Sequence, residues 1–340
     1  MTFATGSRRN IAVLYTGGTI GMQAGEHGLR PSKESVLEAL AAYQQDIDWH
    51  VQVCEPLIDS SLVAPHHWLA WQQWIEAQQC DGVLILHGAH TMAYTANVLA
   101  FALGDIAMPV VITGAQHPLG TAGGDAERNL NGAVQALLQM AAPKAVSLVF
   151  DGKIMAAVGS RKISTRSLDG FSNKNQAPLA KWQNGHWHGL QAACDVSKPR
   201  LPIPLNPDVR IASHYCLPVN EQWALRVLLQ SGQADAVIVQ SFGHGNGGFS
   251  EADVTAMQEF QHQGGIIINI AGKHRRVRLN EGVDGWLVKS IQERSVTFAR
   301  GGESRTLPLP RGALTTYTGV APAPGQAALN NVQPGVSSMA

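Results

Sequence analysis

Short apolar runs that alternate with helical stretches are the feature that most limits how this chain can fold. Each run holds only four to six residues. Runs of this length, separated by helices, are typical of parallel strands that are buried on both faces of a sheet. The sequence therefore predicts an α/β fold. The predicted strands are Ile11 to Tyr15, Gly82 to Leu86, Val110 to Thr113, Ala145 to Phe150, Ala236 to Gln240 and Ile266 to Ile270.

The stretches between these runs carry helical patterns. One of them opens with Ser250-Glu-Ala-Asp253, whose first and last side chains can each accept a hydrogen bond from the other's backbone amide, as in a capping box. This pattern predicts the start of a helix at Ser250. The expected helices are Ser35 to Gln44, His67 to Gln79, Met92 to Leu103, Arg128 to Met140, Asn220 to Gln230 and Ser250 to Gln261.

Composition narrows the class of protein and of partner. The 340 residues include 25 Lys and Arg against 25 Asp and Glu, so no net basic field favours nucleic acid or a membrane surface. No window approaches the roughly 18 apolar residues of a membrane-spanning helix, and the N-terminus lacks a signal core. The scattered cysteines suit reduced thiols that pack in the interior. We therefore expect a cytoplasmic globular protein with a small-molecule partner.

A proline-rich stretch marks the expected domain boundary. Residues 198–208 contain four prolines, which prevent regular structure and stiffen the segment into a linker. We expect one domain over residues 1–197 and a second over residues 209–318. Residues 319–340 carry little apolar patterning and are expected to form a flexible tail.

Polar, glycine-containing loops follow four of the predicted strands. In open α/β sheets ligands bind beyond the carboxyl ends of strands, where glycines let backbone amides approach a ligand and hydroxyl groups can attack or hold it. Any one such loop fits a tight turn equally well. The loops are Thr16 to Thr19, His87 to Thr91, Thr113 to Gln116 and Ser241 to Gly247.

The last of these loops also fits a dinucleotide-binding pattern. Gly243 to Gly248 reads G-x-G-x-x-G between a predicted strand and a predicted helix. The acidic residue that binds a ribose about 20 positions later is missing, since that stretch reads Gln-Gly-Gly-Ile-Ile-Ile. A dinucleotide site is the weakest of the alternatives, and no cofactor is expected.

The sequence contains T-G-G-T-I at residues 16–20 and H-G-x-x-T-M-A-Y-T-A at residues 87–96. With these two patterns, six blocks of the sequence resemble the bacterial asparaginase/glutaminase family, and its cytoplasmic type I L-asparaginases in particular. The T-G-G-T-I and H-G-x-x-T-M-A-Y-T-A patterns are highly specific when they occur together. The resemblance spans roughly residues 10 to 272. The six blocks are Tyr15 to Gln23, Leu57 to Ser61, Leu86 to Ala96, Ile112 to Gln116, Lys162 to Phe171 and Ser241 to Asn246.

The resemblance implies a fold, an assembly and a reaction. It implies a large N-terminal domain with a doubly wound sheet, a smaller C-terminal α/β domain, and active sites completed across an intimate dimer. The expected assembly is a homodimer or a homotetramer. It implies that Thr19 attacks a side-chain amide and passes through an acyl-enzyme ester. A threonine hydroxyl is a poor nucleophile, so it needs a group that takes its proton and donors that stabilise the oxyanion.

The resemblance also assigns further residues. Ser60, with Ser61 beside it, matches the position that holds the substrate's α-carboxylate, and Lys162 matches the lysine of the second catalytic triad. The substrate-binding loops are expected to include Gly18, Gly88, Ala89 and Ala115, together with the two serines.

Two adjacent positions depart from the family. Its H-G-T-D-T loop supplies a threonine and an aspartate where this chain has Ala89 and His90. Ala89 cannot relay a proton to Lys162, and His90 cannot pair with an α-ammonium group as a carboxylate does. The family also has a mobile lid after its first strand, which aligns with Gly25 to Pro31 here. In this lid, Leu29 occupies the place of a tyrosine that helps to activate the nucleophile. Free asparagine is therefore expected to bind poorly.

His90 leaves three interpretations open. It is a new general base, a specificity residue for an amide without a free α-ammonium, or part of a site that no longer catalyses, whether by nature or by engineering. A nearby Lys162 would tend to keep the imidazole neutral. The leading hypothesis is a cofactor-free amidohydrolase with Thr19, Lys162 and His90 as catalytic residues. The rival is a protein of this fold that binds a small carboxylate or amino acid without turnover.

Two further segments carry charge or potential ligands. Residues 273–278 are cationic or His apart from Val277, which fits a solvated surface or an anion-binding wall. His186-Trp-His188 has no third ligand in view, so we expect a surface hairpin and no metal site.

Overall fold

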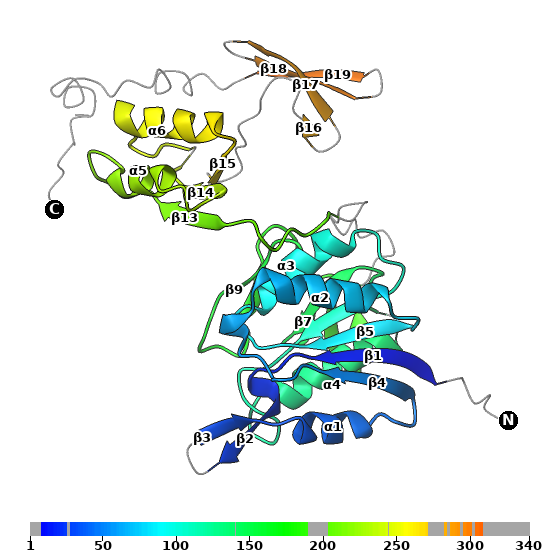
Figure 1. Ribbon diagram of the computed structural model, residues 1–340. Helices are drawn as coiled ribbons and strands as arrows, with labels where there is room; N and C mark the ends of the chain where they lie inside the picture. The colour runs from blue at the N-terminus through cyan, green and yellow to red at the C-terminus, as the bar shows by residue number, and fades with distance from the viewer. Residues whose placement is uncertain are drawn as a thin grey trace, which may run out of the picture. The chain divides into compact units, whose positions relative to one another are not determined.

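The computed structural model describes residues 8–25, 28–139, 141–189, 203–243, 245–270, 282–283, 286–292, 295–300 and 303–308 (Figure 1). The chain divides into two compact units, Met1–Pro207 and Asp208–Ala340. The predicted tail over residues 319–340, the cationic segment 273–278 and linker residues 198–202 lie outside the described residues.

The first unit is built on an eight-stranded sheet with the order β12-β11-β8-β7-β6-β5-β1-β4. The neighbours from β4 to β7 pair in parallel, and those from β7 to β12 pair antiparallel. The predicted α/β fold with a mainly parallel sheet is confirmed. The strands are β4 Ile47–Val53, β1 Arg9–Tyr15, β5 Gly82–Leu86, β6 Val110–Thr113, β7 Val146–Phe150, β8 Lys153–Ala156, β11 Ala180–Gln183 and β12 His186–His188.

Helices cover both faces of this sheet. Along β1, Val13 and Tyr15 point to the core on the side of α1 and α4, and Leu14 points to the core on the side of α2 and α3. Figure 1 shows these two pairs of helices on opposite sides of the strands. The α3 range matches the prediction, and the others are shifted towards the N-terminus. The helices are α1 Glu34–Ala41, α2 Pro65–Glu76, α3 Met92–Leu103 and α4 Ala126–Leu138.

The edge strand β4 was not predicted from the sequence. Its residues alternate between apolar and polar, because only one face of an edge strand meets the core, and they form no continuous apolar run. The short antiparallel strands β8 and β11 were also missed. His186 and His188 lie on β12, which forms an antiparallel hairpin pair with β11, as expected for that segment.

Short pairs of strands lie outside the main sheet. The predicted lid forms an antiparallel pair of β2 (Met22–Gly25) and β3 (Gly28–Pro31), on which Leu29 is 55% exposed. Strand β9 (Ser160–Lys162) pairs with β10 (Phe171–Asn173).

The second unit contains a three-stranded parallel sheet with the order β13-β14-β15. The strands are β13 Ile211–Tyr215, β14 Ala236–Gln240 and β15 Ile266–Ile270, and the helices are α5 Trp223–Gln230 and α6 Glu251–His262. The last two strands match the prediction. Both helices pack on the face that carries Val237 and Val239. Alternate residues of β15 point to the other face, where Ile268 is 49% exposed.

The start of α6 confirms the predicted capping box. The Ser250 hydroxyl accepts from the Asp253 amide, and the Asp253 carboxylate accepts from the Ser250 amide at 2.8 Å. Asp253 is fully buried and also forms an ion pair with Arg226 at 2.6 Å. These partners lower the pKa of Asp253 although its burial acts to raise it.

An antiparallel four-stranded sheet follows and was not predicted. Its strands are β16 Gly282–Val283, β17 Trp286–Gln292, β18 Ser295–Arg300 and β19 Glu303–Pro308, in sequence order. Antiparallel strands need an apolar residue only at alternate positions, so they lack the continuous runs that mark parallel strands. Among the described helices of both units, none has the length and apolar character needed to cross a membrane.

Candidate active site

Three segments that are far apart in the sequence meet at the carboxyl ends of β1 and β5. Because these strands pair in parallel, the loops after them lie at the same edge of the sheet. Gly18 has φ 91°, and a Cβ on it would overlap the Gly88 Cα. A Cβ on Gly88 would lie 2.5 Å from the Ser60 Oγ. The absence of side chains at the two glycines therefore allows Gly18, Gly88 and Ser60 to pack together.

Thr19 begins the 3-10 turn Thr19–Gly21 that follows the first of these loops. Its side chain is half-buried. Within the described part of the chain, no residue forms a hydrogen bond with its hydroxyl or its backbone N–H. Both groups of Thr19 are therefore without a hydrogen-bond partner among the described residues.

Ser60 and Ser61 lie together on the 3-10 turn Ser60–Leu62, but their environments differ. Ser60 is 3% exposed, and its carbonyl accepts from the Thr91 hydroxyl at 2.6 Å. Ser61 is exposed, and both its amide and its hydroxyl donate to the Asp59 carboxylate at 2.9 Å. Ser60 thus faces Gly88, while Ser61 is held by Asp59.

Ala89 and His90 are adjacent in the chain and differ in exposure. Ala89 is 6% exposed and packs in the core beside α3. The His90 side chain is 69% exposed, and its Nδ1 lies 4.0 Å from the Asp59 Oδ1. The bonds from Ser61 lower the pKa of Asp59, and the neighbouring His90 adds to that effect. The expected influence of Lys162 on His90 stays a prediction, and the carboxylate of Asp59 is a charged group beside the His90 ring.

Lys162 ends β9, which is attached to α3 through Asn97. The Asn97 side chain donates to the Ser160 carbonyl at 3.1 Å and accepts from the Gly159 amide at 2.8 Å. Burial lowers the pKa of Lys162, and the charge of Asp125 opposes that shift. The Lys162 Nζ lies 6.0 Å from the centre of the Phe171 ring. None of the described carboxylates forms an ion pair with it.

Ala115 lies in a third loop that a buried carboxylate holds in place. Ala115 is fully buried in the core on the side of α1 and α4. The next two backbone amides, those of Gln116 and His117, donate to Asp125 at 2.9 Å. Asn129 donates to the same carboxylate and to the Gly114 carbonyl. The structure therefore places the Ala115 side chain in the protein interior, although Ala115 belongs to the loop.

Several residues around the site were not assigned a role from the sequence. Asp59 belongs to the Leu57 to Ser61 block, so its place in that block was an available signal. Thr91 lies within the His87 to Thr91 loop. Asp125 and Asn129 had no comparable signal, because their role depends on reaching backbone amides of another loop.

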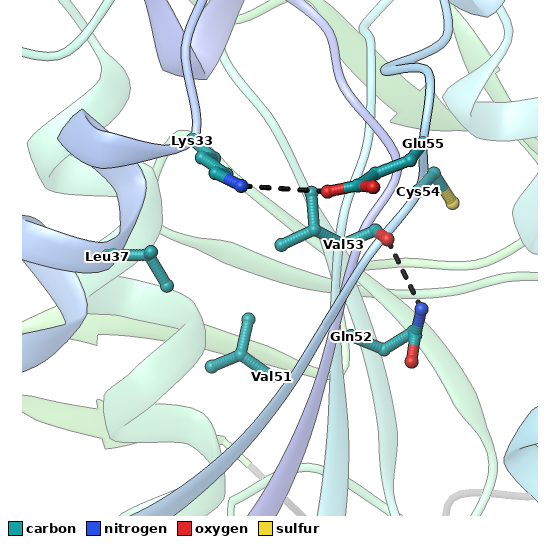
Figure 2. Close-up of a pocket in the computed structure, with 7 residues that line it drawn as sticks. All are labelled: Lys33, Leu37, Val51, Gln52, Val53, Cys54 and Glu55. Carbon is teal, nitrogen blue, oxygen red and sulfur yellow. Dashed lines mark hydrogen bonds and ion pairs between the residues drawn. The ribbon is translucent and has the colours of Figure 1, made fainter.

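A separate hollow of about 580 Å³ lies between α1 and the edge strand β4 (Figure 2). Figure 2 shows Lys33 and Glu55 facing each other across it, with their charged atoms 3.6 Å apart. None of the predicted site residues lines it. Its lining residues are Lys33, Leu37, Val51, Gln52, Val53, Cys54 and Glu55.

Comparison with known proteins identifies the family. Residues 10–194 match the Asparaginase family, described as Asparaginase, N-terminal. The chain belongs to the asparaginase family. L-asparaginase 1 of Escherichia coli K12 is 29% identical over 282 residues, which cover 77% of this chain and 79% of that protein.

Another curated relative is longer than this chain. The mouse 60 kDa lysophospholipase is 30% identical over 299 residues, which cover 79% of this chain and 52% of the lysophospholipase. The chain therefore matches about half the length of that relative.

Solved structures show the same fold. L-asparaginase I from Vibrio cholerae is 27% identical, with a TM-score of 0.68 and coverage of 78% of this chain and 82% of its own. The thermostable L-asparaginase from Thermococcus kodakarensis is 23% identical, with a TM-score of 0.65 and coverage of 79% and 82%. This asparaginase-family chain thus shares the sheet and helix arrangement of both.

Proposed function

We propose that this protein is an amidohydrolase that uses Thr19 as its nucleophile on a small amide related to asparagine or glutamine. The observation that carries the proposal is the close packing of Gly18, Gly88 and Ser60 at the carboxyl edge of the sheet. It brings the loop of Thr19 against the loop of Ala89 and His90. Family membership supports the same reaction class.

The reaction has two steps. The Thr19 Oγ1 attacks the amide carbon and, as the C–N bond breaks, ammonia leaves with a proton taken from the hydroxyl. Water then attacks the resulting ester, which releases the carboxylic acid and restores the threonine. The Thr19 and Ala89 backbone N–H groups, which have no acceptor among the described residues, suit the developing oxyanion. Lys162, whose pKa burial lowers, is the proposed proton carrier.

The proposed substrate carries a carboxylate and lacks a free α-ammonium group. The Ser60 hydroxyl forms no hydrogen bond with the described residues and would hold the carboxylate. Near it, Asp59 already accepts two bonds from Ser61 and faces His90. A free ammonium would therefore meet an imidazole where other family members present a carboxylate. An acylated nitrogen would bind there without a charge penalty.

We also propose a cytoplasmic homodimer or homotetramer, which the resemblance implies and which analytical ultracentrifugation can test. Neither proposal involves nucleic acid, a membrane or a cofactor.

A panel of amides tests the proposed specificity. Ammonia release is measured from asparagine, glutamine, their N-acetyl derivatives and dipeptides with asparagine at the C-terminus. We expect kcat/KM for N-acetyl-asparagine to exceed that for asparagine by at least about tenfold, or about 1.4 kcal/mol, because a free ammonium group would lose part of its hydration beside His90 without gaining the carboxylate partner that other family members supply. Equal or better use of free asparagine would contradict the specificity proposed for His90.

Restoring the two missing groups should move activity towards asparagine. The double variant Ala89→Thr, His90→Asp is expected to raise kcat/KM for asparagine at least about tenfold, with His90→Asp alone acting mainly on KM. His186→Asp adds the same charge on the hairpin strand β12 and serves as the control. If the double variant does not differ from this control, the loss of asparagine activity has another cause, such as Leu29.

The rival function is ligand binding without turnover. The absence of a hydroxyl at Ala89 favours it, because the expected proton relay to Lys162 is broken. Calorimetric binding of an amino acid or dipeptide, with no ammonia from any amide of the panel, would support it.

A further inference from the structure

His87 is a buried side chain behind the site that has no role in the proposed chemistry. It directly follows β5 and is 0% exposed. Its backbone N–H donates to the Thr113 carbonyl at 2.9 Å. A side chain on Gly114 would overlap the His87 carbonyl, so the loops after β5 and β6 pack against each other at this residue. His87 therefore sits where these two loops meet.

The two ring nitrogens of His87 have different and determined roles. The Nδ1 lies 2.8 Å from the Gly88 carbonyl oxygen. A carbonyl oxygen can only accept, so Nδ1 must carry the proton in this contact. In a neutral ring the other nitrogen, Nε2, is then an acceptor. Burial lowers the pKa of His87 to about 4, against the effect of the Gly88 bond, and so keeps the ring neutral at pH 7.

The partner of Nε2 continues a one-way chain of hydrogen bonds. The Thr95 hydroxyl lies 2.9 Å from Nε2 and must donate to it. The same hydroxyl accepts from the indole N–H of Trp68 at 2.9 Å. The bonds therefore run in one direction, from Trp68 on α2 through Thr95 on α3 to His87 and then to the Gly88 carbonyl. We call this series the Trp68 relay.

The last bond of the Trp68 relay sets the direction of an amide in the site. The Gly88 carbonyl and the Ala89 N–H belong to one planar trans peptide, so they point in opposite directions. A carbonyl held towards His87 therefore turns the Ala89 N–H away from it. Ala89 is 6% exposed, yet within the described residues its N–H finds no acceptor. A buried amide without a partner is unusual and marks a place for a ligand oxygen.

We propose that His87 is a positioning residue that holds the Gly88–Ala89 peptide so that the Ala89 N–H faces the reacting amide oxygen. The inference rests on the proposed function, because it names the purpose of a buried group behind that same site. His87 differs in this from His90, which is exposed and free to contact a substrate. His87 neither takes a proton nor touches the substrate, since both of its nitrogens are occupied.

Two variants of His87 test the positioning role with N-acetyl-asparagine as substrate. His87→Leu removes the donor to Gly88, and His87→Asn keeps an N–H close to the place of Nδ1. Loss of one aligned oxyanion donor is expected to lower kcat of His87→Leu about 100-fold, with KM changed less than about threefold. His87→Asn should recover at least about tenfold of that loss. Equal activity of the two variants, or a loss confined to KM, would overturn the proposal.

A matched pair of tryptophan variants tests the Trp68 relay without touching His87. Trp68→Phe removes the indole that donates to Thr95, and Trp49→Phe removes an indole that donates to the Leu40 carbonyl at 2.9 Å. Only the first is expected to shift the nitrogen resonances of the His87 ring and to lower kcat. This pair remains informative if His87→Leu fails to fold. Equal effects of the two variants would contradict the relay.

Nitrogen-15 NMR of the wild-type protein separates this inference from the proposed function. The His87 signal, identified by its loss in His87→Asn, should be that of a neutral ring with the proton on Nδ1. A proton on Nε2, or a charged ring at pH 7, overturns the assignment whether or not any amide is hydrolysed. The wild-type protein could instead release no ammonia from the panel while its NMR signal is as expected. In that case the proposed function fails, and so does the catalytic purpose of the Trp68 relay. The hydrogen-bond geometry of the relay would still be correct.

Discussion

Replacing Thr19 with Ala or Val is expected to lower kcat for N-acetyl-asparagine by about 10⁴-fold or more, because either change removes the attacking oxygen. The Thr19 hydroxyl has no hydrogen-bond partner among the described residues, so its removal leaves no buried group unpaired. The folded protein should therefore keep its stability. The measurement is ammonia release, with thermal unfolding followed in parallel.

Two comparisons make this result specific to the hydroxyl. Val has nearly the shape of Thr, so Thr19→Val separates loss of the oxygen from loss of packing. Thr19→Ser keeps a hydroxyl at the same place and is expected to retain activity within about tenfold of the wild-type. Full activity in Thr19→Val would exclude Thr19 as the nucleophile, and an acyl-enzyme trapped on another residue would do the same.

Replacing Gly18 with Ala should disrupt the site and destabilise the first unit. Gly18 has φ 91° and ψ 176°, a backbone conformation that is nearly restricted to glycine and costs other residues roughly 1–3 kcal/mol. The new Cβ would also meet the Gly88 backbone nitrogen at 2.6 Å, and backbone atoms cannot rotate away. Such overpacking costs about 1–3 kcal/mol more. We expect the free energy of unfolding to fall by about 2–6 kcal/mol in urea denaturation, with almost no ammonia release.

Gly120 provides the matched control for Gly18. It also has a positive φ, 82°, but a Cβ on it would meet nothing within 4 Å. Gly120→Ala should therefore show only the backbone cost, of about 1–2 kcal/mol, and should keep its activity. If Gly18→Ala were no more harmful than Gly120→Ala, the close packing of Gly18 with Gly88 would not hold the site together.

The sequence predicted those elements whose local pattern matches their final environment. Strand β5 is buried on both faces and β14 is buried or half-buried along its length, so both appear as continuous apolar runs with recognisable ends. Helix α3 is bounded by a polar loop and by Gly104, and its range was also predicted. Strand β4 was missed because about half of its side chains face solvent at the sheet edge. Its apolar and polar residues therefore alternate, and it lacks the continuous apolar run from which the other strands were predicted.

The candidate binding loops were identified from the sequence, but their arrangement was not. The glycines at 18 and 88 marked two loops as candidate binding loops. Their contact with Ser60 depends on the parallel pairing of β1 with β5 and on the turn after β4, which brings together residues about 30 to 70 positions apart. The placement of Asp59 beside His90 likewise came only from the folded chain.

The sequence by itself determined the family and the α/β class, because these depend on residue types at fixed spacing, and it singled out Thr19 as the proposed nucleophile. Only the tertiary structure decided where the two histidines lie and what they contact. A histidine can be a base, a ligand or a buried hydrogen-bonding group, and its neighbours along the chain do not distinguish these roles. Burial and partners from α2 and α3 assign His87 to the interior, while exposure leaves His90 facing the solvent beside Asp59.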